Sequence, residues 1–326
     1  MNPIQPLPTQ PVEISVTTPI SQAFDRVKRV LFQPFDLGKW FVIGFAAWLA
    51  HLGEQGFSGG GNFGGPHGGG GNFQHEFDRS RDYVMSNLSW IVPLVVGIVV
   101  VCLILWVVFT WLSSRGKFMF LHCVALNKAE IQKPWEQFAG AGNSLWLFRL
   151  GLGLVGMLVT LPLLALVLVP VFKMVSRGEP NDAAILLAAG ALLAFIVAAI
   201  VFGVVGKLTT DFVVPIMFRR ANKCLAAWGE LRGLLRARFG SFVLYLLMQI
   251  VLGMAIGILV LFVVLVTCCI AGCFLAIPYI GTVLLLPVLV FQRAYSLHFF
   301  AQFGPEYDVF PPDAAPPAVP MSGQPV

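Results

Sequence analysis

The chain has 326 residues, of which 57% are hydrophobic and only 11% are charged. A soluble domain carries about 25% charged residues, so this composition excludes an ordinary water-soluble protein and predicts one embedded in a membrane. The net charge of +5 comes from basic residues beside apolar runs, not on a separate soluble module, which argues against nucleic acid as a partner.

The N-terminal region predicts a proline-rich tail followed by an amphipathic helix. Residues 1–18 contain four prolines and are expected to be disordered. After them, apolar side chains recur at helical spacing, with charged residues elsewhere around the helix. The apolar positions are Ile20, Ala23, Phe24, Val27, Val30 and Leu31. This face either lies on lipid acyl chains at the interface or packs on the protein's own spans.

Six apolar runs follow, and five of them have the roughly 20 residues that a helix needs to cross a bilayer. These five runs cover about 88–112, 145–171, 183–208, 242–267 and 277–300. The first run, 37–52, is short for a crossing, and a re-entrant segment is its alternative. The glycine-rich stretch 53–74 is expected to be a flexible external linker.

The distribution of basic residues predicts the orientation. Fifteen of the 21 Lys and Arg residues lie before or at the start of the first run or in the connections 113–144 and 207–241, and the alternate connections hold four. The positive-inside rule then makes the first run cross and places both termini in the cytoplasm.

We therefore predict an all-α, multi-pass protein of a bacterial cytoplasmic (inner) membrane. Its six transmembrane helices, within 19–303, would form three hairpins, each preceded by a basic, partly amphipathic segment. Residues 304–326 would form a second disordered, proline-rich tail.

Three charged residues lie within or beside the apolar runs. Asp211 is an acid next to the hydrocarbon zone, where an unpaired charge costs at least ~2.5–3.5 kcal/mol. The sequence Thr210-Asp211-Phe212-Val213-Val214-Pro215 favours a simpler role for this acid as the cap of a restarting helix. We also expect Asp211 to form an intramembrane charge pair with Arg149 or Arg293.

Small residues recur every four positions on two of the predicted spans. Gly190, Ala194 and Ala198 lie on the fourth, and Gly253 and Gly257 on the fifth. Such spacing lets helices approach closely. Packing within the chain is the favoured explanation, and a homo-oligomer seam is the alternative.

Three cysteines lie together at the end of the fifth span: Cys268, Cys269 and Cys273. Buried small residues explain them better than a metal site, because no His or acid lies near them. A disulfide from Cys273 remains open if this end faces an oxidising compartment. We predict no metal, cofactor or catalytic residue anywhere in the chain.

The connection 207–241 carries the strongest candidate functional surface, a predicted binding site for anionic lipid headgroups. Its basic residues are Arg219, Arg220, Lys223, Arg232, Arg236 and Arg238. Such juxtamembrane clusters attract anionic lipids. The positive-inside rule alone would also place them there, so the sequence leaves both explanations open.

Three short motifs resemble those of bacterial six-helix membrane domains of unknown function, including the domain associated with some glycerophosphodiester phosphodiesterases. They are Leu31-Phe32-Gln33-Pro34-Phe35 leading into Trp40, Asp211 to Pro215, and Arg293-Ala294-Tyr295-Ser296-Leu297. The resemblance covers roughly 20–303 and implies a shared fold and topology. The soluble phosphodiesterase barrel and its metal ligands are absent from this sequence, so the resemblance implies no catalytic residues.

Two functions follow as hypotheses. The first is a non-catalytic membrane protein that organises or associates with lipids or partner proteins. The second is a small-solute or lipid transporter, which would use the few polar residues within the spans, Thr160 and Gln249, and helices broken at Pro162 and Pro170. An intramembrane enzyme ranks last, because the spans contain no recognisable catalytic constellation.

Overall fold

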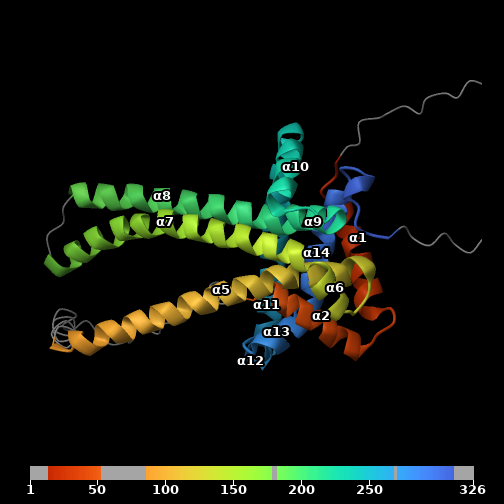
Figure 1. Cartoon of the computed structure of the whole chain (residues 1–326), viewed down its shortest axis with the longest axis horizontal. Coiled ribbons are helices and arrows are strands. Elements are labelled where there is room, and N and C mark those ends of the chain that lie inside the picture. Colours follow the sequence, from red (N-terminus) through yellow and green to blue (C-terminus); the bar gives the residue numbers. More distant parts are fainter. Residues whose placement is uncertain (1–13, 53–85, 178–181, 268–269, 312–326) are drawn as a thin grey trace, which may run out of the picture.

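The computed structural model describes residues 14–52, 86–177, 182–267 and 270–311. Every regular element in these ranges is helical and none is a strand, in agreement with the predicted all-α fold. In chain order (Figure 1) the elements are α1 (Thr18–Val27), η1 (Lys28–Phe32), α2 (Leu37–Ala50), α5 (Leu88–Leu126), α6 (Gln132–Gln137), α7 (Ala139–Arg177), α8 (Asp182–Leu208), η2 (Thr209–Val213), α9 (Val214–Arg220), α10 (Cys224–Ala237), α11 (Phe239–Val266), α12 (Ile270–Leu275), α13 (Pro278–Leu284), α14 (Leu286–Ala301) and η3 (Pro305–Tyr307).

Four helical stretches are long and apolar enough to cross a membrane: Leu88–Leu126, Ala139–Lys173, Asp182–Arg220 and Phe239–Val266. A fifth is present if α13 and α14, which are bent by 64° relative to each other, count as one span. The helix α2 has 14 residues and is about 21 Å long, less than the ~30 Å hydrocarbon core. The expected six spans are therefore not confirmed.

The apolar parts of these helices face outward. In the most apolar 18-residue windows of α5, α7 and α11 no residue is buried. Leu158 of α7 is 75% exposed and Ile258 of α11 is 69% exposed. Continuous apolar surfaces of this size suit hydrocarbon and not water, which is compatible with a multi-pass membrane protein.

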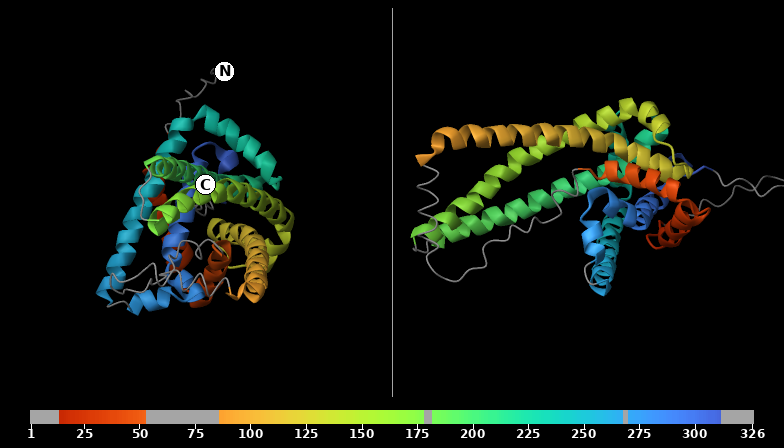
Figure 2. Two further views of the ribbon diagram at one scale, coloured as in Figure 1. Left: turned by 90° about the vertical axis from the view of Figure 1, so that its left-hand side faces the viewer. Right: turned by 90° about the horizontal axis from the view of Figure 1, so that it is seen from below.

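The long helices do not all run in one direction. The helices α5, α7 and α8 extend side by side away from the rest of the molecule, and α7 and α8 are antiparallel neighbours (Figure 1). The helix α11 runs crosswise to them (Figure 2). The short α2 packs against the last third of α5, where Lys39 bonds to Asn127 (2.8 Å) and Ser113 to the Ala50 carbonyl (2.7 Å), and it also contacts α13 and α14. The expected set of three similar hairpins is therefore not confirmed.

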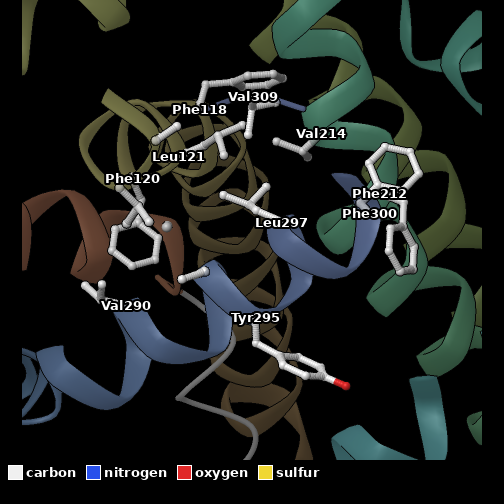
Figure 3. Close-up of a cluster of buried hydrophobic side chains, with 14 of the residues drawn as sticks. Phe118, Phe120, Leu121, Phe212, Val214, Val290, Tyr295, Leu297, Phe300 and Val309 are labelled. Carbon is white, nitrogen blue, oxygen red and sulfur yellow. The ribbon is translucent and has the colours of Figure 1, made fainter. Parts of the chain in front are cut away.

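One hydrophobic core lies where these helices converge (Figure 3). It combines α1, α2, the last third of α5, the η2–α9 segment, the start of α11 and α14. The boundary of the core along α5 is sharp. The side chains of this helix are mostly exposed up to Phe109 and mostly buried from Ser113 onward. At its centre, Phe212 contacts the rings of Phe242 and Phe300, each with centroids 5.2 Å away.

The predicted amphipathic helix has the expected apolar face, which packs on the protein itself. Ala23 and Val27 of α1 are buried, as are Val30 and Leu31 of the π-helical turn that follows. The partner of α1 is α14. The structure therefore shows packing on the chain's own helices at these four positions, while Phe24 of the same apolar face is 55% exposed, which leaves the compatible lipid-facing role a prediction.

The folded region is longer than the sequence predicted at both ends. Residues 14–18 and 304–311, which we had assigned to disordered tails, pack against the core. The Ser15 amide donates to Gln302 Oε1 (2.8 Å), and Tyr307 and Val309 are buried. These segments contribute apolar side chains to the core, which proline content alone does not reveal. The glycine-rich stretch 53–74 lies outside the described residues.

Candidate functional site

The segment around Asp211 is a wide helical turn inside a continuous helix. Pro215 has no amide hydrogen, and in a regular α-helix its ring would clash with the carbonyl four residues earlier, that of Asp211. The chain adopts a π-helical turn, η2, at this point, and such turns are frequent at functional sites. Asp211 caps no helix, because the residue preceding α9 is Val213 and makes no side-chain cap bond. The favoured capping role was therefore wrong.

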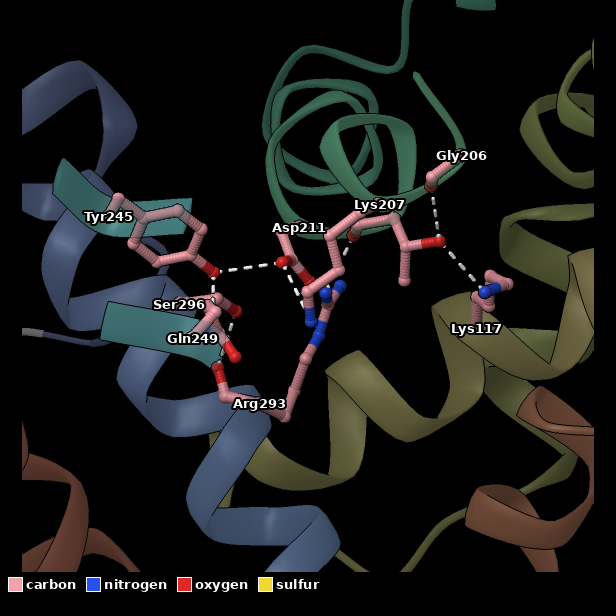
Figure 4. A network of polar contacts seen from close by, with 9 residues as sticks. Lys117, Gly206, Lys207, Asp211, Tyr245, Gln249, Arg293 and Ser296 are labelled. Carbon is pink, nitrogen blue, oxygen red and sulfur yellow. Dashed lines mark hydrogen bonds and ion pairs between the residues drawn. The ribbon is translucent and has the colours of Figure 1, made fainter. Parts of the chain in front are cut away.

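Asp211 lies at the centre of a buried polar network (Figure 4). Its Oδ2 atom lies 3.0 Å from Lys207 Nζ and accepts a 2.8 Å hydrogen bond from the Tyr245 hydroxyl. The Tyr245 oxygen in turn accepts a 2.7 Å bond from Gln249 Nε2. Lys207 lies one helical turn before Asp211 on the same helix and Tyr245 lies on α11, so two helices supply partners to the same carboxylate oxygen.

The two arginines predicted to pair with Asp211 have other partners. Arg293 Nη1 donates to the Thr210 carbonyl at 2.7 Å, so it lies beside the acid without forming the ion pair. Arg149 donates to Ser113 Oγ at 3.0 Å. The expected arginine pair is thus corrected to a pair with Lys207, whose position four residues before Asp211 on the same helix makes it the nearest cation.

A cavity of about 410 Å³ opens beside this network, between the end of α2, α5, α8 and α14. We call it the Lys117–Arg293 cavity. Its lining includes Lys117, Asp211 and Arg293, which are all buried, and Lys207, whose side chain is 40% exposed. Lys117 Nζ donates to Thr210 Oγ1 at 2.9 Å. Among the described residues, three cations and one carboxylate therefore line one space.

A second cavity of about 320 Å³ lies on the other side of the same helix, between α5, α7 and α8. Trp106 and Arg149 contribute to its lining. It shares Gly206 and Thr210 with the first cavity. The junction of α8 with η2 therefore separates two partly polar spaces.

The six basic residues of the predicted surface are exposed, and one of them, Arg220, is ion-paired. Arg219, Lys223, Arg232, Arg236 and Arg238 are exposed and have no carboxylate within ion-pair distance in the described part of the chain. In contrast, Arg220 Nη2 lies 2.8 Å from Glu230 Oε1. Because Glu230 neutralises it, Arg220 contributes less to an anion-binding surface than the other five.

The helix α10 holds this surface in place through its inner face. Its buried residues are Cys224, Ala227 and Leu231, and burial raises the pKa of the Cys224 thiol to about 12. Beneath Arg220, burial raises the pKa of Tyr307 to about 12, with a further contribution from nearby Glu230. Both groups are therefore uncharged at neutral pH, and the charge on this face is that of the exposed arginines and Lys223.

The small residues singled out in the sequence lie on open surfaces. At Gly190, Gly253 and Gly257 an added Cβ would meet no atom within 4 Å. Ala194 is exposed and Ala198 half-buried. An oligomer seam at these positions stays a prediction. Cys273 is an exposed free thiol, and Cys268 and Cys269 lie outside the described residues.

Sequence reasoning missed three members of the polar network: Lys117, Lys207 and Tyr245. We had counted Lys117 as part of a connecting loop, whereas it lies in the buried part of α5. The four-residue spacing of Lys207 and Asp211 was a usable signal. No sequence signal links Tyr245 to Asp211, since they lie on different helices.

Residues 14–288 match a family of unknown function, DUF7544. The chain belongs to this family. The match begins where the described structure begins and includes every residue of the polar network except Arg293. It establishes no link to the membrane domain associated with glycerophosphodiester phosphodiesterases. No curated protein and no solved structure matches the chain.

Proposed function

We propose that this protein is a non-catalytic, multi-pass protein of a bacterial cytoplasmic membrane that associates with anionic lipids through the surface of α9 and α10. The observation that carries the proposal is the group of five exposed cations for which the described residues provide no carboxylate partner. Exposed apolar side chains lie among them, Leu225 at 75% and Phe239 at 67%. The cations would bind anionic lipid headgroups, and the exposed apolar side chains beside them would contact the acyl chains.

Contacts between the two ends of the described chain support the proposed orientation. Ser15 bonds to Gln302 in both directions, and the Tyr295 hydroxyl donates to the Val16 carbonyl at 3.0 Å. Both ends therefore lie on the same side of any membrane, which requires an even number of crossings. Four crossings or six satisfy this requirement; we propose six, with α2 as the short sixth, and the positive-inside rule places both ends in the cytoplasm. The resemblance to the phosphodiesterase-associated domain is part of this proposal.

The proposal predicts that removing charge from α10 weakens the response to anionic lipid. Each basic residue near an anionic surface contributes about 1 kcal/mol. In neutral detergent, added phosphatidylglycerol should raise the unfolding temperature of the wild type more than phosphatidylcholine does. The variant Arg232→Gln/Arg236→Gln should lose at least half of that difference, measured by differential scanning fluorimetry.

A matched control is available in two lysines that are already ion-paired. Lys28 lies 3.9 Å from Asp25 and Lys133 lies 3.3 Å from Glu130. The variant Lys28→Gln/Lys133→Gln removes the same charge and should keep the full response. If both variants lost the same part of the response to phosphatidylglycerol, the response would depend on net charge alone, which would contradict a specific lipid-binding surface on α10.

A transporter of small solutes or lipids is the second candidate, and the two cavities flanking η2 favour it. The predicted helix breaks do not support it, because α7 continues through Pro162 and Pro170. Native mass spectrometry of the purified protein distinguishes the candidates. Stoichiometric recovery of a soluble small molecule would favour transport, and recovery of phospholipid alone would favour lipid association.

A further inference from the structure

We propose that the junction of α5, α6 and α7 binds the phosphate group of a phospholipid through Arg115. The site consists of Arg115, Trp111, Trp135 and Asn143, and we call it the Arg115 site. It lies on other helices than the basic surface of α9 and α10 and goes beyond the function proposed for that surface. The group that it recognises is the phosphodiester itself, whatever the net charge of the lipid.

The guanidinium group of Arg115 lies in the corner between two indole rings. Its Cζ atom is 4.6 Å from the ring centroid of Trp111, one turn earlier on α5, and 4.9 Å from that of Trp135 on α6. The two rings are almost perpendicular, at 88°, with their centroids 5.9 Å apart. Each contact is a cation–π interaction, which holds the charged group in place but does not neutralise it, because the rings carry no net charge.

The start of α7 completes the site. Gly142 lets the Arg115 side chain approach this helix closely, since an added Cβ would lie 2.9 Å from Arg115 Cγ. The next residue, Asn143, accepts hydrogen bonds at its Oδ1 atom from Arg115 Nη2 and from Trp111 Nε1, both at 3.2 Å. Three helices therefore fix the position of one cation. A side chain held in this way loses little conformational freedom when it binds a ligand.

In the described part of the chain, no carboxylate lies within ion-pair distance of Arg115. The two acids of the adjoining segment have other partners, because Glu130 pairs with Lys133 at 3.3 Å and Glu136 accepts a 3.4 Å bond from Gln132. Arg115 Nε is buried without a hydrogen-bond partner among the described residues, which is unfavourable for a charged donor. Guanidinium binds phosphate through two parallel hydrogen bonds. The half-buried Arg115 thus offers both charge and donors to such a group.

The Arg115 site lies where the exposed apolar surfaces of α5 and α7 end. Phe109 is the last large exposed apolar side chain of α5, and Leu147 is the first of α7. At 1.5 Å per residue, Arg115 lies about 9 Å beyond Phe109, and Asn143 about 6 Å before Leu147. Lipid phosphates occupy this level of a bilayer, and indole rings favour the same interfacial layer. The position therefore favours a phospholipid over a soluble phosphate as the ligand.

The experiment compares phosphatidylcholine with diacylglycerol of the same acyl chains, each added to the intact protein in neutral detergent. The two lipids differ only in the phosphocholine group. Phosphatidylcholine has no net charge, so the basic surface of α10 contributes little to the difference. We expect phosphatidylcholine to raise the unfolding temperature more than diacylglycerol does. Arg115→Gln should weaken the apparent affinity for phosphatidylcholine about tenfold or more, because it removes charge-assisted hydrogen bonds.

Lys133→Gln is the matched control. Lys133 lies on the adjacent helix α6, is exposed and is ion-paired with Glu130. This variant removes one positive charge near the site and should bind phosphatidylcholine like the wild type. Arg232→Gln/Arg236→Gln should do so as well, which separates the Arg115 site from the α10 surface and its test with phosphatidylglycerol.

A further variant decides if Arg115→Gln does not fold. Gly142→Ala keeps every charge, but its added Cβ would displace the Arg115 side chain from α7. The apparent affinity for phosphatidylcholine should therefore fall severalfold in this variant, although its net charge is that of the wild type.

Several outcomes would overturn the proposal. Phosphatidylcholine could have no advantage over diacylglycerol, or the advantage could fall equally in Lys133→Gln. An advantage that survives in both Arg115→Gln and Gly142→Ala would mean that the choline group binds elsewhere or on the indole rings. Inorganic phosphate, added at constant ionic strength with chloride as the compensating anion, tests the remaining alternative. If it stabilises the protein through Arg115 as well as phosphatidylcholine does, the site binds a soluble oxyanion and the lipid assignment is wrong.

Discussion

At the scale of single residues, the decisive feature is a buried carboxylate whose partners come from two helices. Lys207 lies on the same helix as Asp211 and is 40% exposed, whereas Tyr245 is fully buried on α11. A hydrogen bond to a buried charged group contributes about 1.5–3 kcal/mol, and removing one partner of a fully buried ion pair costs about 3–5 kcal/mol. Because Asp211 is buried and Lys207 is partly exposed, the hydroxyl and the lysine should both stabilise the fold.

We predict that Tyr245→Phe lowers the free energy of unfolding by about 1.5–3 kcal/mol, because it leaves Asp211 short of a donor and Gln249 without an acceptor. Lys207→Met should cost about 1–3 kcal/mol, because it leaves a buried carboxylate without its cation while Lys207 itself is partly exposed. Thermal and denaturant unfolding in detergent would measure both variants. A loss below about 1 kcal/mol for Lys207→Met would mean that the hydroxyl, and not the ion pair, holds Asp211.

At the scale of elements, the join between α2 and α5 depends on one glycine. An added Cβ on Gly116 would lie 2.6 Å from both the Ala50 nitrogen and the Leu49 carbonyl carbon. Both atoms belong to the backbone of α2, which cannot rotate away as a side chain can. Close helix approach through a small residue therefore explains how a short helix stays attached to the end of α5.

We predict that Gly116→Ala destabilises the protein by about 1–3 kcal/mol, because the two helix backbones must separate. Gly97→Ala lies on the same helix in open space and should stabilise the helix by roughly 0.5–1 kcal/mol. Unfolding temperatures of the two variants, compared in the same detergent, provide the measurement. Equal effects would show that α2 does not press on α5 at Gly116.

At the scale of the whole molecule, the hydrophobic core lies at one end of α5, α7 and α8, and the apolar surfaces of these helices beyond the core are exposed. The three longest helical stretches in the described chain have 35 to 39 residues, and their buried residues lie close to the core, apart from Ala188 and Ala191 of α8. The polar network and both of its flanking cavities lie at this transition. The arrangement separates the part that would contact acyl chains from the part that could bind a polar ligand.

The proposed orientation predicts opposite labelling of two positions by a membrane-impermeant maleimide. In variants with one cysteine each, Cys273 on exposed α12 should react in intact cells, and Arg232→Cys on α10 only after permeabilisation. Cys224 would not react in either state, because its thiol is buried and its pKa is raised to about 12. Labelling of Arg232→Cys in intact cells would invert the proposed topology.

The sequence by itself determined the helical class, the apolar stretches and the basic surface on α10, since each depends on local composition and periodicity. The tertiary structure decided what depends on residues far apart in the chain. In the tertiary structure the Tyr245 hydroxyl donates to Asp211 and Arg293 donates to a backbone carbonyl. Lys117, which the sequence assigns to a connection between spans, is buried in a helix. The sequence alone does not tell whether a charged residue is exposed to solvent or lines a cavity, because this depends on how helices that are distant in the sequence pack together.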